Sequence, residues 1–219
     1  MNARSCLARV ALVALAVLPL ALGADQADAS SRHKGKASAR TISRTFTNSG
    51  RIEINSFGSA SPFPSAILVS GFKKGKVTDV DLVLKGFGHG RTQDVDVMLV
   101  APDGRNALVM SDVGKASYSA GITIHLDDEA EVTFPDATTL ELMSGTYRPE
   151  NIADSPDPDV FDTTYAPIPS GNVALSTFDG GDPNGQWRLF VRDDTSAGAG
   201  FLADGWELTI TAKVKGKKR

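Results

Sequence analysis

The stretch that decides the fold is Asp182-Pro183-Asn184-Gly185-Gln186-Trp187-Arg188-Leu189-Phe190-Val191-Arg192-Asp193-Asp194, and a similar stretch follows it, Gly205-Trp206-Glu207-Leu208-Thr209-Ile210-Thr211. In each, a turn leads into an alternating strand that opens with one of the two tryptophans of the chain. Two such strands cannot bury their apolar faces alone, so they predict an antiparallel sheet packed on a second sheet. The residues that we expect to face this core are Trp187, Leu189, Val191, Trp206, Leu208 and Ile210.

Short alternating runs continue the pattern from Arg51 onward. The further predicted strands are Ile52–Ile54, Ala66–Val69, Val77–Leu84, Asp94–Val100, Ala107–Met110, Ile122–Leu126 and Val173–Phe178. Turns rich in Gly, Pro and Asp separate them, and no helical apolar period persists beyond residue 29. The segment from Pro149 to Pro169 contains five prolines, so we expect it to be one extended surface loop. The pattern predicts an all-β sandwich of about eight or nine antiparallel strands.

The N-terminus is typical of an export signal. Arg4 and Arg9 precede an apolar run from Val10 to Leu22 that is too short to span a bilayer as a helix. We expect residues 1–29 to be a signal peptide and the mature chain to be secreted, with a retained membrane anchor as the alternative. The only cysteine, Cys6, would be removed with the signal, which excludes disulfides and thiol chemistry in the mature chain.

Charge divides the remaining chain into an acidic domain with basic flanks. Residues 46–212 carry 24 acids against 11 Lys and Arg, a net charge near −13. We expect one domain over 46–213, a flexible basic linker over 30–45 and a basic tail over 214–219. The tail either contacts an anionic surface polymer or is simply solvated. No nucleic-acid partner is expected, because so acidic a domain repels phosphate.

The sequence offers no recognisable catalytic constellation. Of the three histidines, His33 lies in the expected linker, His125 alternates outward on a strand and His89 lies in a glycine-rich turn. The serine-hydrolase elbow, the zinc-protease motif and the phosphate-binding loops are absent from the sequence. A pair of carboxylates acting as a glycosidase is the remaining enzymatic alternative, but few aromatics suggest a sugar platform. We therefore expect no enzyme activity.

Acidic pairs make calcium the expected cofactor. Calcium prefers six to eight hard oxygen ligands, which irregular acidic turns supply. The candidate metal ligands are Asp94, Asp96, Asp127, Asp128, Asp193 and Asp194. The alternative is that these are solvated strand-edge acids that guard against aggregation.

Several stretches together form a recognisable pattern. They are Pro64–Gly71, His89–Gly104, Met110–Gly114, Leu126–Ala130, Ser144–Pro149, Leu175–Phe178 and the two tryptophan segments. In this order they resemble the P domain, also called Homo B, which follows the subtilisin-like catalytic domain of proprotein convertases and occurs in many bacterial secreted proteins. The resemblance implies a jelly-roll, galactose-binding-domain-like β-sandwich that packs on a protease without being catalytic.

The protease activity of that family is not expected here, because these 219 residues contain no subtilisin-like catalytic domain. We expect instead a secreted module that binds or stabilises an extracytoplasmic partner, with structural calcium. An accessory of a subtilisin-like protease and a cell-surface adhesion module are the two alternatives. An extracellular protease, a cell-surface protein and an anionic polymer are the corresponding partners.

Overall fold

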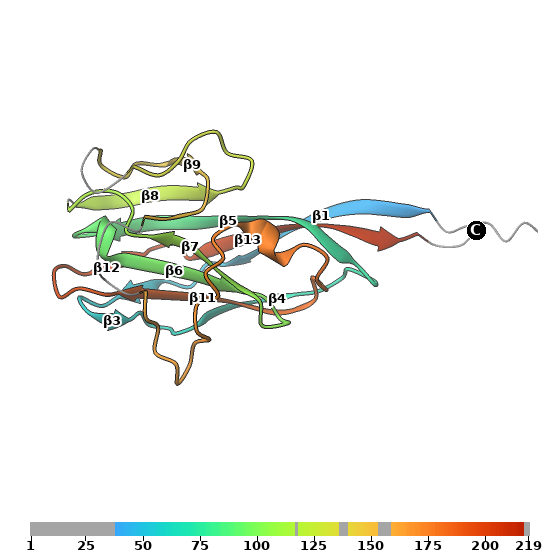
Figure 1. The fold of residues 1–219 in the computed structure, drawn as a ribbon, viewed down its shortest axis with the longest axis horizontal. Coiled ribbons are helices and arrows are strands. Elements are labelled where there is room, and N and C mark those ends of the chain that lie inside the picture. Colours follow the sequence, from blue (N-terminus) through green and yellow to red (C-terminus); the bar gives the residue numbers. More distant parts are fainter. Residues whose placement is uncertain (1–37, 117, 136–139, 153–158, 217–219) are drawn as a thin grey trace, which may run out of the picture. The chain divides into compact units, whose positions relative to one another are not determined.

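Two β-sheets packed face to face form the folded unit (Figure 1). The computed structural model describes residues 38–116, 118–135, 140–152 and 159–216, all within the compact unit Gly35–Arg219. Residues 1–29, the expected signal peptide, lie outside the described residues, as do Cys6 and His33. The prediction of an all-β sandwich is confirmed.

The first sheet has seven strands. They are β1 (Ala39–Asn48), β13 (Trp206–Lys215), β5 (Lys76–His89), β12 (Gly200–Leu202), β2 (Ile52–Ile54), β8 (Ser119–Leu126) and β9 (Gly145–Tyr147). The long strand β5 pairs with β13 and β12 along one edge and with β8 along the other. This sheet therefore collects segments from both ends of the described chain.

The second sheet has six strands. They are β10 (Glu150–Asn151), β7 (Asn106–Ser111), β6 (Val95–Val100), β11 (Gly185–Asp193), β3 (Gly58–Ser59) and β4 (Ser65–Val69). Two 3-10 turns, η1 (Thr92–Asp94) and η2 (Leu175–Phe178), complete the described elements. The sequence predicted antiparallel strands, but two pairs are parallel: β10 with β7, and β8 with β9.

Both tryptophan strands face the core as predicted. Trp187 and Trp206 are fully buried, and the other four expected core residues of β11 and β13 are at most 1% exposed. Each indole N–H has a partner: Trp187 donates to the carbonyl of Pro183 and Trp206 to Ser65 Oγ, both at 2.9 Å. A buried indole N–H needs such an acceptor. The two hydrogen bonds therefore fix the orientation of rings that also form part of the core.

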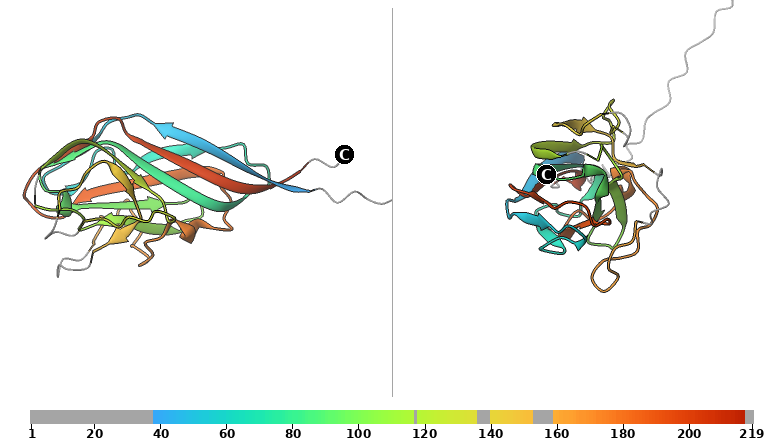
Figure 2. Two further views of the ribbon diagram at one scale, coloured as in Figure 1. Left: turned by 90° about the horizontal axis from the view of Figure 1, so that it is seen from above. Right: turned by 90° about the vertical axis from the view of Figure 1, so that its left-hand side faces the viewer.

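The paired strands extend beyond the expected domain limits. Residues 39–45, predicted as linker, belong to β1, which pairs along its whole length with β13 up to Lys215 (Figure 2). Only Ile42 and Phe46 of β1 pack against the core. The backbone ladder thus holds this strand more than burial does, which explains why its composition resembles a linker.

Three local predictions are corrected by the structure. Leu175–Phe178 forms η2 instead of a strand, with Leu175 and Phe178 buried. His89, expected in a turn, closes β5. The segment after Pro149 is more than a surface loop, because Phe161 and Ala166 are buried on the outer face of the second sheet. There they pack on a cluster formed with Met98, Val100, Leu108 and Phe190.

Candidate functional site

His89 is sealed inside the protein. Its side chain and that of Asp193 are fully buried, with His89 Nε2 3.0 Å from Asp193 Oδ2. The other ring nitrogen, Nδ1, lies 2.7 Å from the carbonyl oxygen of Arg91 and 3.2 Å from the backbone nitrogen of the same residue. In this position His89 ties the end of β5 to the end of β11 and does not face solvent. His125, by contrast, is exposed on β8.

Two of the six expected metal ligands lie beside basic side chains. Asp94 Oδ2 lies 3.1 Å from Arg91 Nε, and Asp193 faces His89. Asp193 also accepts a hydrogen bond of 3.0 Å from the backbone N–H of Thr195. Burial raises the pKa of Asp193, while the charge of His89 opposes that rise.

A different acidic cluster lies beside residues 159–166, which we call the covering segment because Phe161 and Ala166 pack on the outer face of the second sheet. Asp96, which is 1% exposed, lies on the outer face of β6, in line with the apolar residues that Phe161 covers. The pairing of β7 with β6 shifts register at Val109, which turns Ser111 to the same outer face. Ser111 Oγ lies 2.7 Å from Asp96 Oδ1 and 2.7 Å from Asp159 Oδ1.

The surroundings of Asp96 are strongly acidic. Burial raises the pKa of Asp96 well above its usual range, and the charges of Asp194, Asp159 and Asp112 add to the rise, while the hydrogen bond from Ser111 opposes it. Asp112 Oδ2 lies 3.3 Å from Ser111 Oγ, and the φ of Asp112 is +56° in the left-handed region. Such a backbone is unfavourable for a residue with a side chain and often marks functional sites.

A second group of acids gathers where β8 ends. Burial first, then the charges of Asp79, Asp127, Glu129 and Asp128, raises the pKa of Asp81 to about 6. Asp127 and Asp128, two of the expected metal ligands, each accept backbone hydrogen bonds here. Asp127 accepts from the backbone of Glu129 at 2.7 Å, and Asp128 accepts from the first two N–H groups of η2 at 2.8 and 2.7 Å.

The structure therefore divides the six expected ligands among separate surroundings. Of them, Asp96 contacts Ser111, and the charge of Asp194 acts on Asp96. Sequence reasoning missed Ser111 and Asp159, which only the fold brings to Asp96. As the side chains stand, no three His, Cys, Asp or Glu of the described residues converge as a ready-made metal site.

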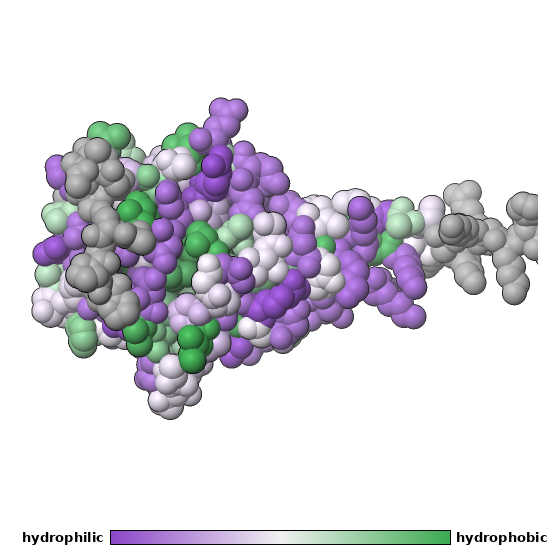
Figure 3. Space-filling model, in the orientation of Figure 1, coloured by the Kyte–Doolittle hydropathy of each residue, from purple (hydrophilic) through white to green (hydrophobic). Residues whose placement is uncertain are grey.

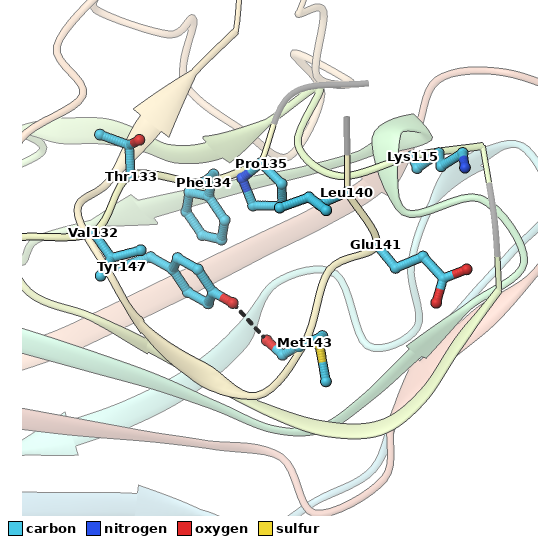
Figure 4. Close-up of a pocket in the computed structure, with 9 residues that line it drawn as sticks. All are labelled: Lys115, Val132, Thr133, Phe134, Pro135, Leu140, Glu141, Met143 and Tyr147. Carbon is cyan, nitrogen blue, oxygen red and sulfur yellow. Dashed lines mark hydrogen bonds between the residues drawn. The ribbon is translucent and has the colours of Figure 1, made fainter. Parts of the chain in front are cut away.

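An apolar pocket of about 690 Å³ opens beside β9 (Figure 4). The rings of Phe134 and Tyr147 stack with centroids 4.6 Å apart on one side of it. Tyr147 donates its hydroxyl proton to the carbonyl oxygen of Met143 at 3.0 Å. The remaining lining residues are Lys115, Val132, Thr133, Pro135, Leu140 and Glu141.

The apolar residues at the edge of this pocket are unusually open to solvent. Val132 is 55% exposed, and Leu140 and Met143 are each 67% exposed. Hydrophobic side chains gather on the half of the surface that carries β8 and β9, whereas the surface towards the ends of β1 and β13 is mostly polar (Figure 3). Grouped exposed apolar residues mark interaction sites. No sequence pattern predicted this pocket, because it is built from irregular connections.

A basic groove of about 530 Å³ lies along the outer ends of β1 and β13. Arg40 and Arg44 of β1, Lys73 of the turn after β4, and Lys215 line it. Lys215 belongs to the expected basic tail, whose last residues 217–219 lie outside the described part. The structure thus adds three cations from elsewhere in the chain to the tail.

Comparison with known proteins shows a weak likeness to a solved structure. No family model matches the chain, and no curated protein matches it. Among solved structures, it is similar to the crystal structure of a serine protease of Aeromonas sobria, with 15% identity and a TM-score of 0.39. The match covers 82% of this chain but only 28% of the protease chain. A likeness this weak carries no argument about activity. Separately, no helix among the described residues is long and apolar enough to cross a membrane.

Proposed function

We propose that this protein is a non-catalytic, extracytoplasmic module that docks a protein partner through the apolar pocket beside β9. The observation that carries the proposal is the exposure of Val132, Leu140 and Met143 around a pocket with an ordered aromatic wall. The signal-like N-terminus supports the extracytoplasmic setting. Burial of His89 supports a non-catalytic role, because the ring is closed off from solvent.

The energetics of the pocket suit a docking surface. Fully burying a side chain of this size contributes about 1.5–3 kcal/mol, so three partly exposed anchors supply roughly 3–6 kcal/mol before the cost of association. The stacked rings and the Tyr147–Met143 hydrogen bond limit the ordering that a partner must impose. The resemblance of the sequence to P domains favours a subtilisin-like protease as that partner.

Selection of peptides from a displayed random library against the full chain tests this proposal. We expect the selected peptides to carry aliphatic or aromatic anchors. Met143→Glu and Leu140→Glu should each weaken binding about 10-fold or more, because a charge replaces an apolar contact. Leu68→Glu is the matched control, since Leu68 is 75% exposed on β4 and does not line the pocket. Equal binding by the wild type and both pocket variants would rule out this docking surface.

Adhesion to an anionic polymer is the second candidate function, and the basic groove favours it. Arg40, Arg44, Lys73 and Lys215 would contact acidic groups electrostatically. Such binding should fall steeply with added salt, whereas docking through the apolar pocket should persist. Binding of a polyanion such as polyglutamate, lost in about 0.5 M NaCl and in the variant Arg44→Ala/Lys73→Ala, would support adhesion.

A further inference from the structure

Asp96 is a buried carboxylate, and one of its oxygens has no hydrogen-bond partner among the described residues. Its side chain is 1% exposed, and the oxygen without a partner is Oδ2. An ionised carboxylate in such a place is costly unless a cation or a proton compensates it. Arg192 stands opposite Asp96 on β11, and its Nε atom is likewise buried without a hydrogen-bond partner, yet the described residues show no ion pair between the two side chains. As the side chains stand, no ion pair balances the charge of Asp96.

Proton counting around Ser111 leads to the same conclusion. A serine hydroxyl has one proton to donate. Ser111 Oγ nevertheless lies 2.7 Å from both Asp96 Oδ1 and Asp159 Oδ1, and 3.3 Å from Asp112 Oδ2. With these carboxylates ionised, at least one short contact brings two electron-rich oxygens together. Either a shared proton or a bound cation would remove the repulsion.

The remaining neighbours favour oxygen coordination. Asn151 Nδ2 donates to Asp159 Oδ2 at 2.7 Å, which fixes that carboxylate beside Ser111. Asp112 is held next to Ser111, and the backbone N–H of Asp194 donates to the carbonyl of Asp94 at 3.1 Å. Acids from three separate segments, β6, the end of β7 and the covering segment, thus surround one hydroxyl, and Asp194 after β11 adds negative charge near Asp96.

We propose that Asp96, Ser111 and Asp159 bind a calcium ion, with Asp112 and Asp194 as further ligands. Calcium tolerates irregular oxygen sets of six to eight ligands, and waters complete such shells. Asp96, Asp112 and Asp159 already approach the same hydroxyl, and the charge of Asp194 acts on Asp96. The ion would join β6, β7 and the covering segment, and so stabilise the folded state by mass action.

The experiment measures the Tm of the full chain once in a chelator and once in about 1 mM CaCl2. Calorimetric titration of calcium into the same protein counts the bound ions. We expect one bound ion and a rise in Tm of about 5–10 °C. Asp96→Asn and Asp159→Asn should each lose this rise, and Asp96→Asn should melt above the wild type in chelator because it removes an uncompensated charge. Asp81→Asn, in the other acidic group, should keep the rise.

Two results would overturn the calcium site. One is a wild-type Tm that calcium leaves unchanged, which would mean that a shared proton alone relieves the cluster. The other is a rise that both Asp96→Asn and Asp159→Asn retain, because the ion would then bind elsewhere. The two variants remove different ligands, so a folding defect in one leaves the other as a test. Neither result bears on peptide binding at the apolar pocket.

Discussion

Replacing Asp81 with asparagine measures how strongly the acids at the end of β8 repel one another. Asp81 lies on the outer face of β5, where partial burial and the charges of Asp79, Asp127 and Asp128 raise its pKa. The amide of asparagine has nearly the same shape as the carboxyl but carries no charge. The substitution therefore removes the repulsion and leaves the packing almost unchanged.

The size of the effect follows from the pKa. A rise from 3.8 to about 6 corresponds to about 3 kcal/mol at about 1.4 kcal/mol per unit. Because the Asp81 carboxyl is only partly buried, solvent screens much of this energy. We expect Asp81→Asn to increase the free energy of unfolding by about 1 kcal/mol at neutral pH.

The gain should depend on pH in a defined direction. Between pH 3.8 and about 6 the folded state holds the Asp81 proton more tightly than the unfolded state does. Stability from this group is therefore lost as pH rises through about 6, and the full penalty applies above it. The advantage of Asp81→Asn should be largest above that range and should vanish below pH 3.8.

Urea denaturation followed by tryptophan fluorescence is the assay, because both tryptophans are buried. Asp103→Asn is the control of opposite sign, because the hydrogen bond from Arg105 lowers the pKa of Asp103. Loss of this carboxylate should destabilise the folded state at neutral pH, and the effect should shrink as pH falls. A gain for Asp81→Asn that is equal at all pH values, or absent at neutral pH, would refute the reasoning.

Two stability predictions concern the packing of the sandwich. Ser65→Ala should lower the free energy of unfolding in urea by about 1–3 kcal/mol, because it removes the acceptor of the buried Trp206 N–H. The control is Ser70→Ala, since Ser70 is exposed. A cost under about 0.5 kcal/mol for Ser65→Ala would contradict the role of Ser65. Phe161→Ala should cost about 3 kcal/mol, because the ring is 2% exposed between the covering segment and the second sheet. The 62% exposed Tyr165 gives the control Tyr165→Ala, and equal small effects would mean that the segment does not pack.

Alternation in the sequence was enough to predict the sandwich and its central strands. The positions that alternate inward in β11 and β13 are buried as predicted, although the outward Phe190 is buried as well, under the covering segment. The alternation of apolar and polar residues did not predict the structure where a segment is held by something other than burial of one face. Residues 39–45 expose most side chains and are held by pairing with β13, and Leu175–Phe178 has strand-like residues in a 3-10 turn. A Gly-rich end to β5 was likewise mistaken for a turn.

The candidate sites could be predicted only in part. The sequence offered Asp96 and Asp194 among six candidate metal ligands, but Ser111 reaches Asp96 through a register shift that no local pattern encodes. Asp159 comes from a segment whose prolines suggested only a loop. The apolar pocket depends on Leu140 and Met143 staying exposed, and sequence alone cannot distinguish exposed apolar residues from core.

Docking through the apolar pocket is tested most directly by mapping bound peptide on the isotope-labelled full chain by NMR. With a selected peptide in about 0.5 M NaCl, we expect amide shifts confined to residues 132–135 and 140–147. The same peptide should leave the Met143→Glu variant unshifted. Shifts at Arg40, Arg44 and Lys73 instead, or shifts spread evenly over both sheets, would contradict the proposed docking surface.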